Sequence, residues 1–144
     1  MTLLDCIADD QSPPPLSQSA INLVDSVCVG HIGTVTEDGH PHVSPVNTVW
    51  VLSSGYHFAF AHIQSHRTVR HLRTQPHIAL SVTEPRNAQE LLVRGLATIA
   101  TPNQRLFDAL AWAYQKRRGS LPLGVHAFVV AEVLSWRLIP DANK

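Results

Sequence analysis

Residues 33–46 read GTVTEDGHPHVSPV, a stretch typical of two β-strands joined by a tight turn. His31 to Thr36 predicts the first strand, and Pro41 to Val51 predicts the second. Asp38-Gly39 tolerates the positive φ angles that a two-residue hairpin turn requires. The stretch therefore predicts an antiparallel hairpin at the start of an antiparallel sheet.

Four further segments are typical of strands because they are rich in Val, Leu, Phe and other sheet-forming residues. They are residues 56–61, 77–83, 90–100 and 125–138. Tight turns join most consecutive strands, so we expect a mainly antiparallel arrangement. The fold class expected is mainly β with helices: a six-stranded β-barrel, closed or nearly closed, flanked by helices that cover its openings.

Three segments are typical of helices. Apolar residues recur at helical spacing over residues 17–28, which predicts the first helix. Ser65 can cap a short second helix that ends at Thr74, before Pro76. A third helix is expected from Thr101, where Pro102 and Gln104 complete the pattern of a capping box, to Gly119.

The chain length of 144 residues and its 44% hydrophobic content predict one folded domain. We expect residues 1–15, which end in three prolines, to form a flexible arm before a single domain over residues 16–144. No apolar run reaches the roughly 18 residues of a membrane span, and the first residues do not resemble an export signal. Two cysteines are too few for a disulfide framework, so a cytoplasmic location is expected.

Most catalytic and metal-binding patterns are missing. The chain contains no Gly-x-Ser-x-Gly sequence, and no two carboxylates pair within an apolar segment. His40 and His42 share a strand face but lack the second pair of ligands that a structural zinc site needs, so no metal is expected.

The distribution of charge points instead to an anion. The segment from Gly39 to Thr83 contains no Asp or Glu, although it carries three arginines and seven histidines. It is too short and too poor in lysine for a nucleic-acid surface, which leaves a local anion pocket or a merely solvated polar surface.

The sharpest candidate for that pocket is SHRTVR, residues 65–70, at the predicted start of the second helix. Unpaired backbone N–H groups and the positive end of the helix dipole favour a phosphate there. Arg67 can bind a phosphate bidentately, and Ser65 and Thr68 offer hydroxyl donors. The alternative is a capped helix with a solvated arginine face.

Three stretches resemble, in order, motifs of the pyridoxamine 5'-phosphate oxidase-like, FMN-binding split-barrel family. They are the hairpin 33–46, the helix and strand of residues 65–80, and LVRGLA at 92–97. The resemblance extends from Val29 to Ile99. It implies a split β-barrel that forms a homodimer, with FMN bound at the interface between the two copies.

The same resemblance implies which residues contact the cofactor. Arg67 matches the first phosphate-binding cation of the family, whereas Thr68 stands where many members have Lys. Asn47 stands where the true oxidases have Arg, and Glu90 where they have Gln. The full set of implied cofactor-binding residues is Asn47, Thr48, Val49, Trp50, Ala61, His62, Ser65, His66, Arg67, Thr68 and Arg70.

The implied function is that of an FMN-dependent oxidoreductase acting on a small molecule, because a flavin carries the redox chemistry itself. The tail WRLIP, residues 136–140, resembles the closing residues of the true oxidases without their Arg/His substrate motif. We therefore do not expect vitamin B6 synthesis. The alternatives are a deazaflavin-dependent reductase, a haem-binding or haem-degrading protein with His62 or His66 as iron ligand, and a protein that binds flavin without turnover.

Overall fold

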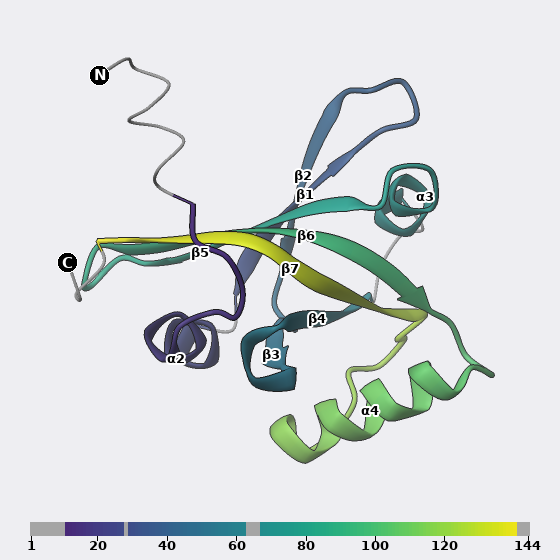
Figure 1. Cartoon of the computed structure of the whole chain (residues 1–144). Helices are drawn as coiled ribbons and strands as arrows, with labels where there is room; N and C mark the ends of the chain where they lie inside the picture. Colours follow the sequence, from purple (N-terminus) through teal and green to yellow (C-terminus); the bar gives the residue numbers. More distant parts are fainter. Residues whose placement is uncertain (1–10, 28, 63–66, 141–144) are drawn as a thin grey trace.

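The computed structural model describes residues 11–27, 29–62 and 67–140 (Figure 1). Within these ranges the α-helices are α2 (Gln18–Val27), α3 (Arg67–Thr74) and α4 (Arg105–Arg118). The strands are β1 (Gly30–Val35), β2 (Pro41–Val46), β3 (Trp50–Leu52), β4 (His57–His62), β5 (His77–Glu84), β6 (Gln89–Ala100) and β7 (Ala127–Ile139).

The described strands form one antiparallel sheet with the order β2-β1-β5-β6-β7-β4-β3. The sheet is open, because β2 at one edge and β3 at the other do not pair. This arrangement confirms the mainly β, split-barrel fold, whereas the expectation of a closed or nearly closed barrel is wrong. The described residues form seven strands rather than the six expected.

The extra strand arises because the segment 41–51 is not one strand. Residues 41–46 pair with β1, whereas residues 50–52 pair with β4 at the far edge of the sheet. Between them, Thr48 Oγ1 accepts a hydrogen bond from Ala61 N–H at 3.0 Å and donates to the Ala61 carbonyl at 2.9 Å. These two side-chain bonds attach the crossing segment to β4 just before the β3–β4 ladder begins at Trp50 and Ala59.

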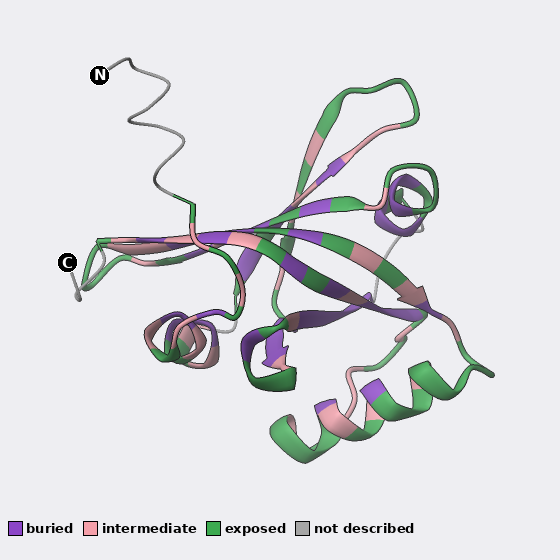
Figure 2. Cartoon of the chain, in the orientation of Figure 1, coloured by how far each residue is buried: buried purple, intermediate pink, exposed green. Residues whose placement is uncertain are grey.

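Apolar side chains on the two faces of the sheet form two clusters. The larger cluster lies inside the curve of the sheet and beneath α2, and includes Ile32, Phe58, Val93 and Val133. A smaller cluster around Trp50 packs under α4. Figure 2 shows buried and exposed residues alternating along β6 and β7, as expected for strands with one face toward a core.

The helices begin close to where the sequence predicts, with one correction. Ser17 Oγ accepts a hydrogen bond from Ala20 N–H at 3.2 Å and caps α2. Gln104 Oε1 accepts from Thr101 N–H at 3.0 Å, as a capping box requires. However, Asn103 has a φ of 79°, which no α-helix accommodates, so α4 begins only at Arg105. The predicted cap Ser65 lies outside the described residues.

The part of the predicted N-terminal arm that the structure describes lies against β7. Ser12 and Trp136 exchange backbone hydrogen bonds of 2.8 and 3.0 Å. Trp136 Nε1 also donates to the carbonyls of Pro13 and Pro15, at 2.9 and 3.0 Å. Residues 1–10 of that arm are outside the described ranges. None of the described helices is long and apolar enough to cross a membrane.

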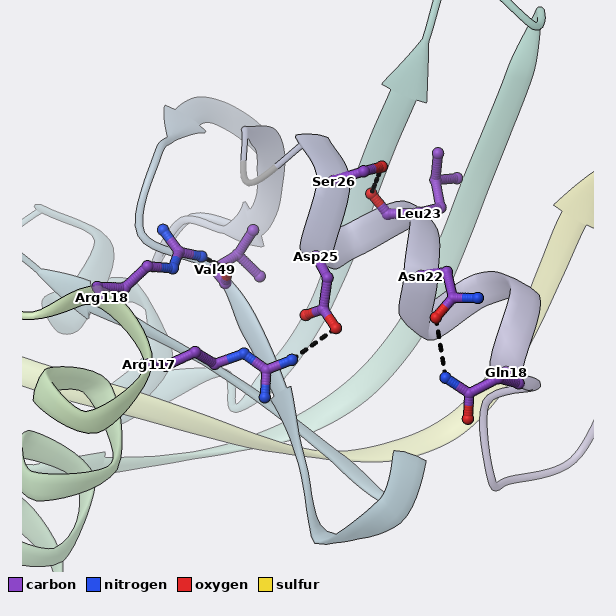
Figure 3. Close-up of polar contacts among 8 residues, drawn as sticks. All are labelled: Gln18, Asn22, Leu23, Asp25, Ser26, Val49, Arg117 and Arg118. Atoms are coloured by element: carbon purple, nitrogen blue, oxygen red, sulfur yellow. Dashed lines mark hydrogen bonds and ion pairs between the residues drawn. The ribbon is translucent and has the colours of Figure 1, made fainter.

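The C-terminal end of α4 contacts the segment that joins β2 to β3 (Figure 3). Arg118 Nη2 donates to the Val49 carbonyl at 2.7 Å, and its guanidinium stands over the Tyr114 ring at 5.7 Å. The neighbouring Arg117 forms an ion pair with Asp25 of α2. Arg118 therefore satisfies a backbone carbonyl in the crossing segment.

We expect Arg118→Ala to lower the free energy of unfolding by about 1 to 2 kcal/mol, because it removes both the hydrogen bond and the cation–π contact. Arg117→Ala is the matched control: its ion pair is partly exposed, so the loss should stay below about 1 kcal/mol. Urea unfolding of the two variants measures the difference, and equal losses would contradict the importance of the Val49 contact.

Candidate functional site

A cleft of about 550 Å³ opens beside β2, the end of β4 and the start of α3. That volume lies within the range of small-molecule sites, roughly 300 to 1,000 Å³. The cleft is lined by Val29, Ile32, His42, Val43, Ser44, Pro45, Val46, Asn47, Phe60, Ala61, His62, Arg67 and Thr68. A second hollow, of about 530 Å³, lies by α4 and contains none of the residues predicted for the site.

The cleft brings together five of the predicted residues from three separate segments. Asn47 follows β2, Ala61 and His62 end β4, and Arg67 and Thr68 begin α3. β2 and β4 are not neighbours in the strand order of the sheet. These segments therefore meet through the three-dimensional fold and not through strand pairing. Ser65 and His66 lie outside the described residues.

Three predicted residues, Thr48, Val49 and Trp50, do not line the cleft. Thr48 is occupied by its two hydrogen bonds to Ala61. Val49 is fully buried in the larger core cluster. Trp50 packs edge-on against Tyr114 and Phe128, with ring centroids 5.3 and 6.0 Å apart. The resemblance implies that these three residues contact the cofactor, whereas of this segment only their neighbour Asn47 lines the cleft.

Arg70 also lies off the cleft. The buried residues of α3 are Thr68, Val69, His71 and Leu72, whereas Arg67, Arg70 and Arg73 are exposed. Because successive helical residues are about 100° apart, Arg70 points roughly away from Thr68. Arg67 reaches the cleft because it stands at the first position of the helix.

Sequence reasoning missed the contribution of β2 to this cleft. His42, Ser44 and Val46 alternate with the more exposed residues 41, 43 and 45 along the strand. This period of two assigns those three side chains to one face, but Val43 and Pro45 of the other face line the cleft as well, so alternation alone does not identify the contribution of β2. The walls of the cleft are therefore partly polar, from residues of β2, and partly apolar, from Ile32 and Phe60.

The electrostatic character of the cleft favours an anion. No Asp or Glu is among its lining residues, and Arg67 lies at the start of α3, where the helix dipole adds positive potential. Among the described residues, no three His, Cys, Asp or Glu side chains gather closely enough to hold a metal ion.

One buried histidine lies directly beneath the cleft. His71 Nδ1 is 3.0 Å from Thr34 Oγ1, and the His71 ring meets the His42 ring edge-on, with centroids 5.1 Å apart. Burial lowers the pKa of His71, and His42, Arg70 and Arg67 lower it further, while Glu37 opposes them. His71 is therefore neutral at pH 7.

A model of the family described as pyridoxamine 5'-phosphate oxidase matches residues 22–137, most of the chain. The chain belongs to this family. No curated protein sequence matches it at a significant level. Membership of the pyridoxamine 5'-phosphate oxidase family agrees with the open antiparallel sheet and the order of motifs.

Solved structures with the same fold include proteins with different ligands. An F420 reductase has 23% identity and a TM-score of 0.63, over 84% of this chain and 98% of that one. An FMN-binding protein from Syntrophomonas wolfei has 12% identity and a TM-score of 0.64, over 85% and 84%. The haem storage protein HutZ from Vibrio cholerae has 17% identity and a TM-score of 0.59, over 84% and 90%. At these identities the likenesses show the fold.

The burial of neutral His71 makes stability depend on pH. Its pKa is lowered from 6.5, so just below pH 6.5 the unfolded chain binds more protons than the folded protein. The free energy of unfolding should therefore fall as the pH drops below about 6.5. We expect a smaller fall in His71→Asn, measured by urea unfolding at pH 7.5 and 5.5. The same loss in both proteins would contradict the assignment.

Proposed function

We propose that this chain binds FMN in the cleft and acts as a flavin-dependent oxidoreductase on a small organic molecule. The observation that carries the proposal is the composition of the cleft, in which partly apolar walls lead to Arg67 and Thr68 at a helix start, with no carboxylate among the lining residues. A flavin mononucleotide has the matching chemistry, an aromatic ring system joined to a phosphate.

The lining residues fit the two ends of that cofactor. Arg67 and Thr68 would hold the phosphate, by charge and by hydrogen bond. Ile32 and Phe60 would exclude water from the ring system, and Asn47 offers an amide that can bind its polar edge. When bound, FMN supplies the hydride or electron transfer, so the protein needs to bind and orient rather than to provide a catalytic acid.

A deazaflavin cofactor such as F420 is the second candidate, favoured by one observation. Arg67, Arg70 and Arg73 are three exposed arginines at intervals of three residues along α3. Such a stripe can attract a longer polyanionic tail than that of FMN. Haem is the third, since His62 lines the cleft.

Absorption spectra of the purified protein, followed by titrations with FMN, F420 and haemin, discriminate among these cofactors. Bound FMN absorbs with two bands in the near-ultraviolet and blue, whereas haem gives one intense Soret band. Saturable binding of FMN, with micromolar or tighter affinity, is the expected result. Binding of haemin or F420 alone would overturn the FMN proposal.

Arg67→Ala should weaken FMN binding by about 2 to 3 kcal/mol, the range for hydrogen bonds to charged groups. This corresponds to a dissociation constant about 30 to 150 times higher. Riboflavin, which lacks the phosphate, should bind both proteins alike. Arg70→Ala is the matched control, because Arg70 is on the same helix but off the cleft, and its effect on FMN should be small. An unchanged FMN titration of Arg67→Ala would refute the phosphate assignment.

We further propose a two-fold homodimer with the cofactor site at its interface. Leu92 and Leu96 of β6 and Leu134 of β7 are between 36% and 44% exposed on the outer side of the sheet. Contact with a second copy would remove these apolar side chains from water. We expect light scattering to give the mass of a dimer at micromolar concentration, and Leu96→Glu to shift it toward monomer. Thr83→Glu, an exposed change elsewhere on the sheet, is the control. A monomeric wild-type protein would exclude the dimer.

A further inference from the structure

Two of the segments that line the cleft, β2 and the first turn of α3, are not hydrogen-bonded to each other in the sheet. Among the described strands, β2 is an edge strand that pairs with β1 alone, and Figure 1 shows the β1–β2 hairpin extending away from the rest of the sheet. The other wall is the first turn of α3, which is not part of the sheet. Some contact must therefore fix the spacing between the hairpin and the helix.

We propose that His71 and Thr34 are positioning residues that lock the phosphate-binding turn of α3 against the β1–β2 hairpin. This inference rests on the proposed function. Neither residue lines the cleft, so each acts through its neighbours. Thr34 is 3% exposed and His71 is 5% exposed, and their polar atoms are 3.0 Å apart. Removing either polar group would leave the other buried without this hydrogen-bond partner.

The position of His71 connects both walls at once. On α3 it follows Arg67 by four residues and Thr68 by three, so it lies one turn below them on nearly the same helix face. On the hairpin, Thr34 and His42 are cross-strand partners, and His71 contacts both of them, one by hydrogen bond and one ring to ring. His42 itself lines the cleft.

The surroundings of His71 favour its neutral form. Burial lowers its pKa most, His42 on β2 and then Arg70 and Arg67 on its own helix lower it further, and Glu37 in the hairpin turn opposes them. A neutral imidazole forms one hydrogen bond with the Thr34 hydroxyl: either Nδ1–H donates to Oγ1, or the hydroxyl donates to Nδ1. The contact is therefore a short, uncharged link between helix and hairpin.

The test measures the dissociation constants of riboflavin and FMN. The riboflavin constant divided by the FMN constant isolates the contribution of the phosphate, and this ratio falls when phosphate binding weakens. Thr34→Val keeps the shape of the side chain and removes its hydroxyl, so the ratio should fall by about three- to tenfold. The Asn amide in His71→Asn can still form a hydrogen bond with Thr34, whereas the Leu side chain in His71→Leu cannot. The ratio should therefore stay closer to the wild-type value in His71→Asn than in His71→Leu. Thr83→Val, the same change at an exposed site, should leave it as in wild type.

The outcomes separate this inference from the function on which it rests. Wild-type protein that binds neither flavin overturns the proposed function, and the inference with it. A folded Thr34→Val protein with the wild-type ratio overturns the inference alone. So does a variant in which the affinities for riboflavin and FMN fall by the same factor, because that is the signature of general destabilisation. Binding is measured under conditions where urea unfolding shows each variant to be folded.

Discussion

The crossing of the chain from β2 to β3 is the constraint on which the rest of the structure depends. Buried backbone groups must find hydrogen-bond partners, and a segment that leaves one sheet edge for another loses those of the ladder. Arg118 supplies one to the Val49 carbonyl of the crossing segment, and the Thr48 hydroxyl of that segment bonds both backbone groups of Ala61 in β4, beyond the end of the β3 ladder. With these bonds in place, consecutive strands can occupy opposite edges of one sheet.

This crossing also creates the cleft. It places Asn47 at the exit of β2, next to the end of β4, and so brings the hairpin and the start of α3 to one place. Thr48, Val49 and Trp50 of the crossing segment are buried and do not line the cleft. The residues that build the site are therefore those just before and opposite the crossing.

Much of the fold could be predicted because its signals are local. The Asp38-Gly39 turn and the apolar periods of α2 and β6 each depend on neighbouring residues, as does the start of α3, which identified Arg67 and Thr68. The break between β2 and β3 could not be predicted, since the Thr48–Ala61 bonds join residues 13 apart and alternation does not specify the partner strand. The late start of α4 at Arg105 depends on the φ of Asn103, which the capping-box pattern does not reveal.

The prolines of β2 have a consequence beyond the site. Thr36 N–H donates to the His40 carbonyl, so the hydrogen-bonded pairs of the hairpin fall on even residues, and Pro41 and Pro45 occupy the alternate positions that face outward. The outer rim of β2 is thereby left with Val43 as its one amide donor within the strand. An unprotected edge strand can pair with another chain and start fibrous aggregation. Two of the six residues of β2 are prolines, which have no N–H group, so a second chain could not form a complete hydrogen-bond ladder along this edge. The protein can thus keep an exposed hairpin beside an open cleft and still resist the self-association that such an edge invites.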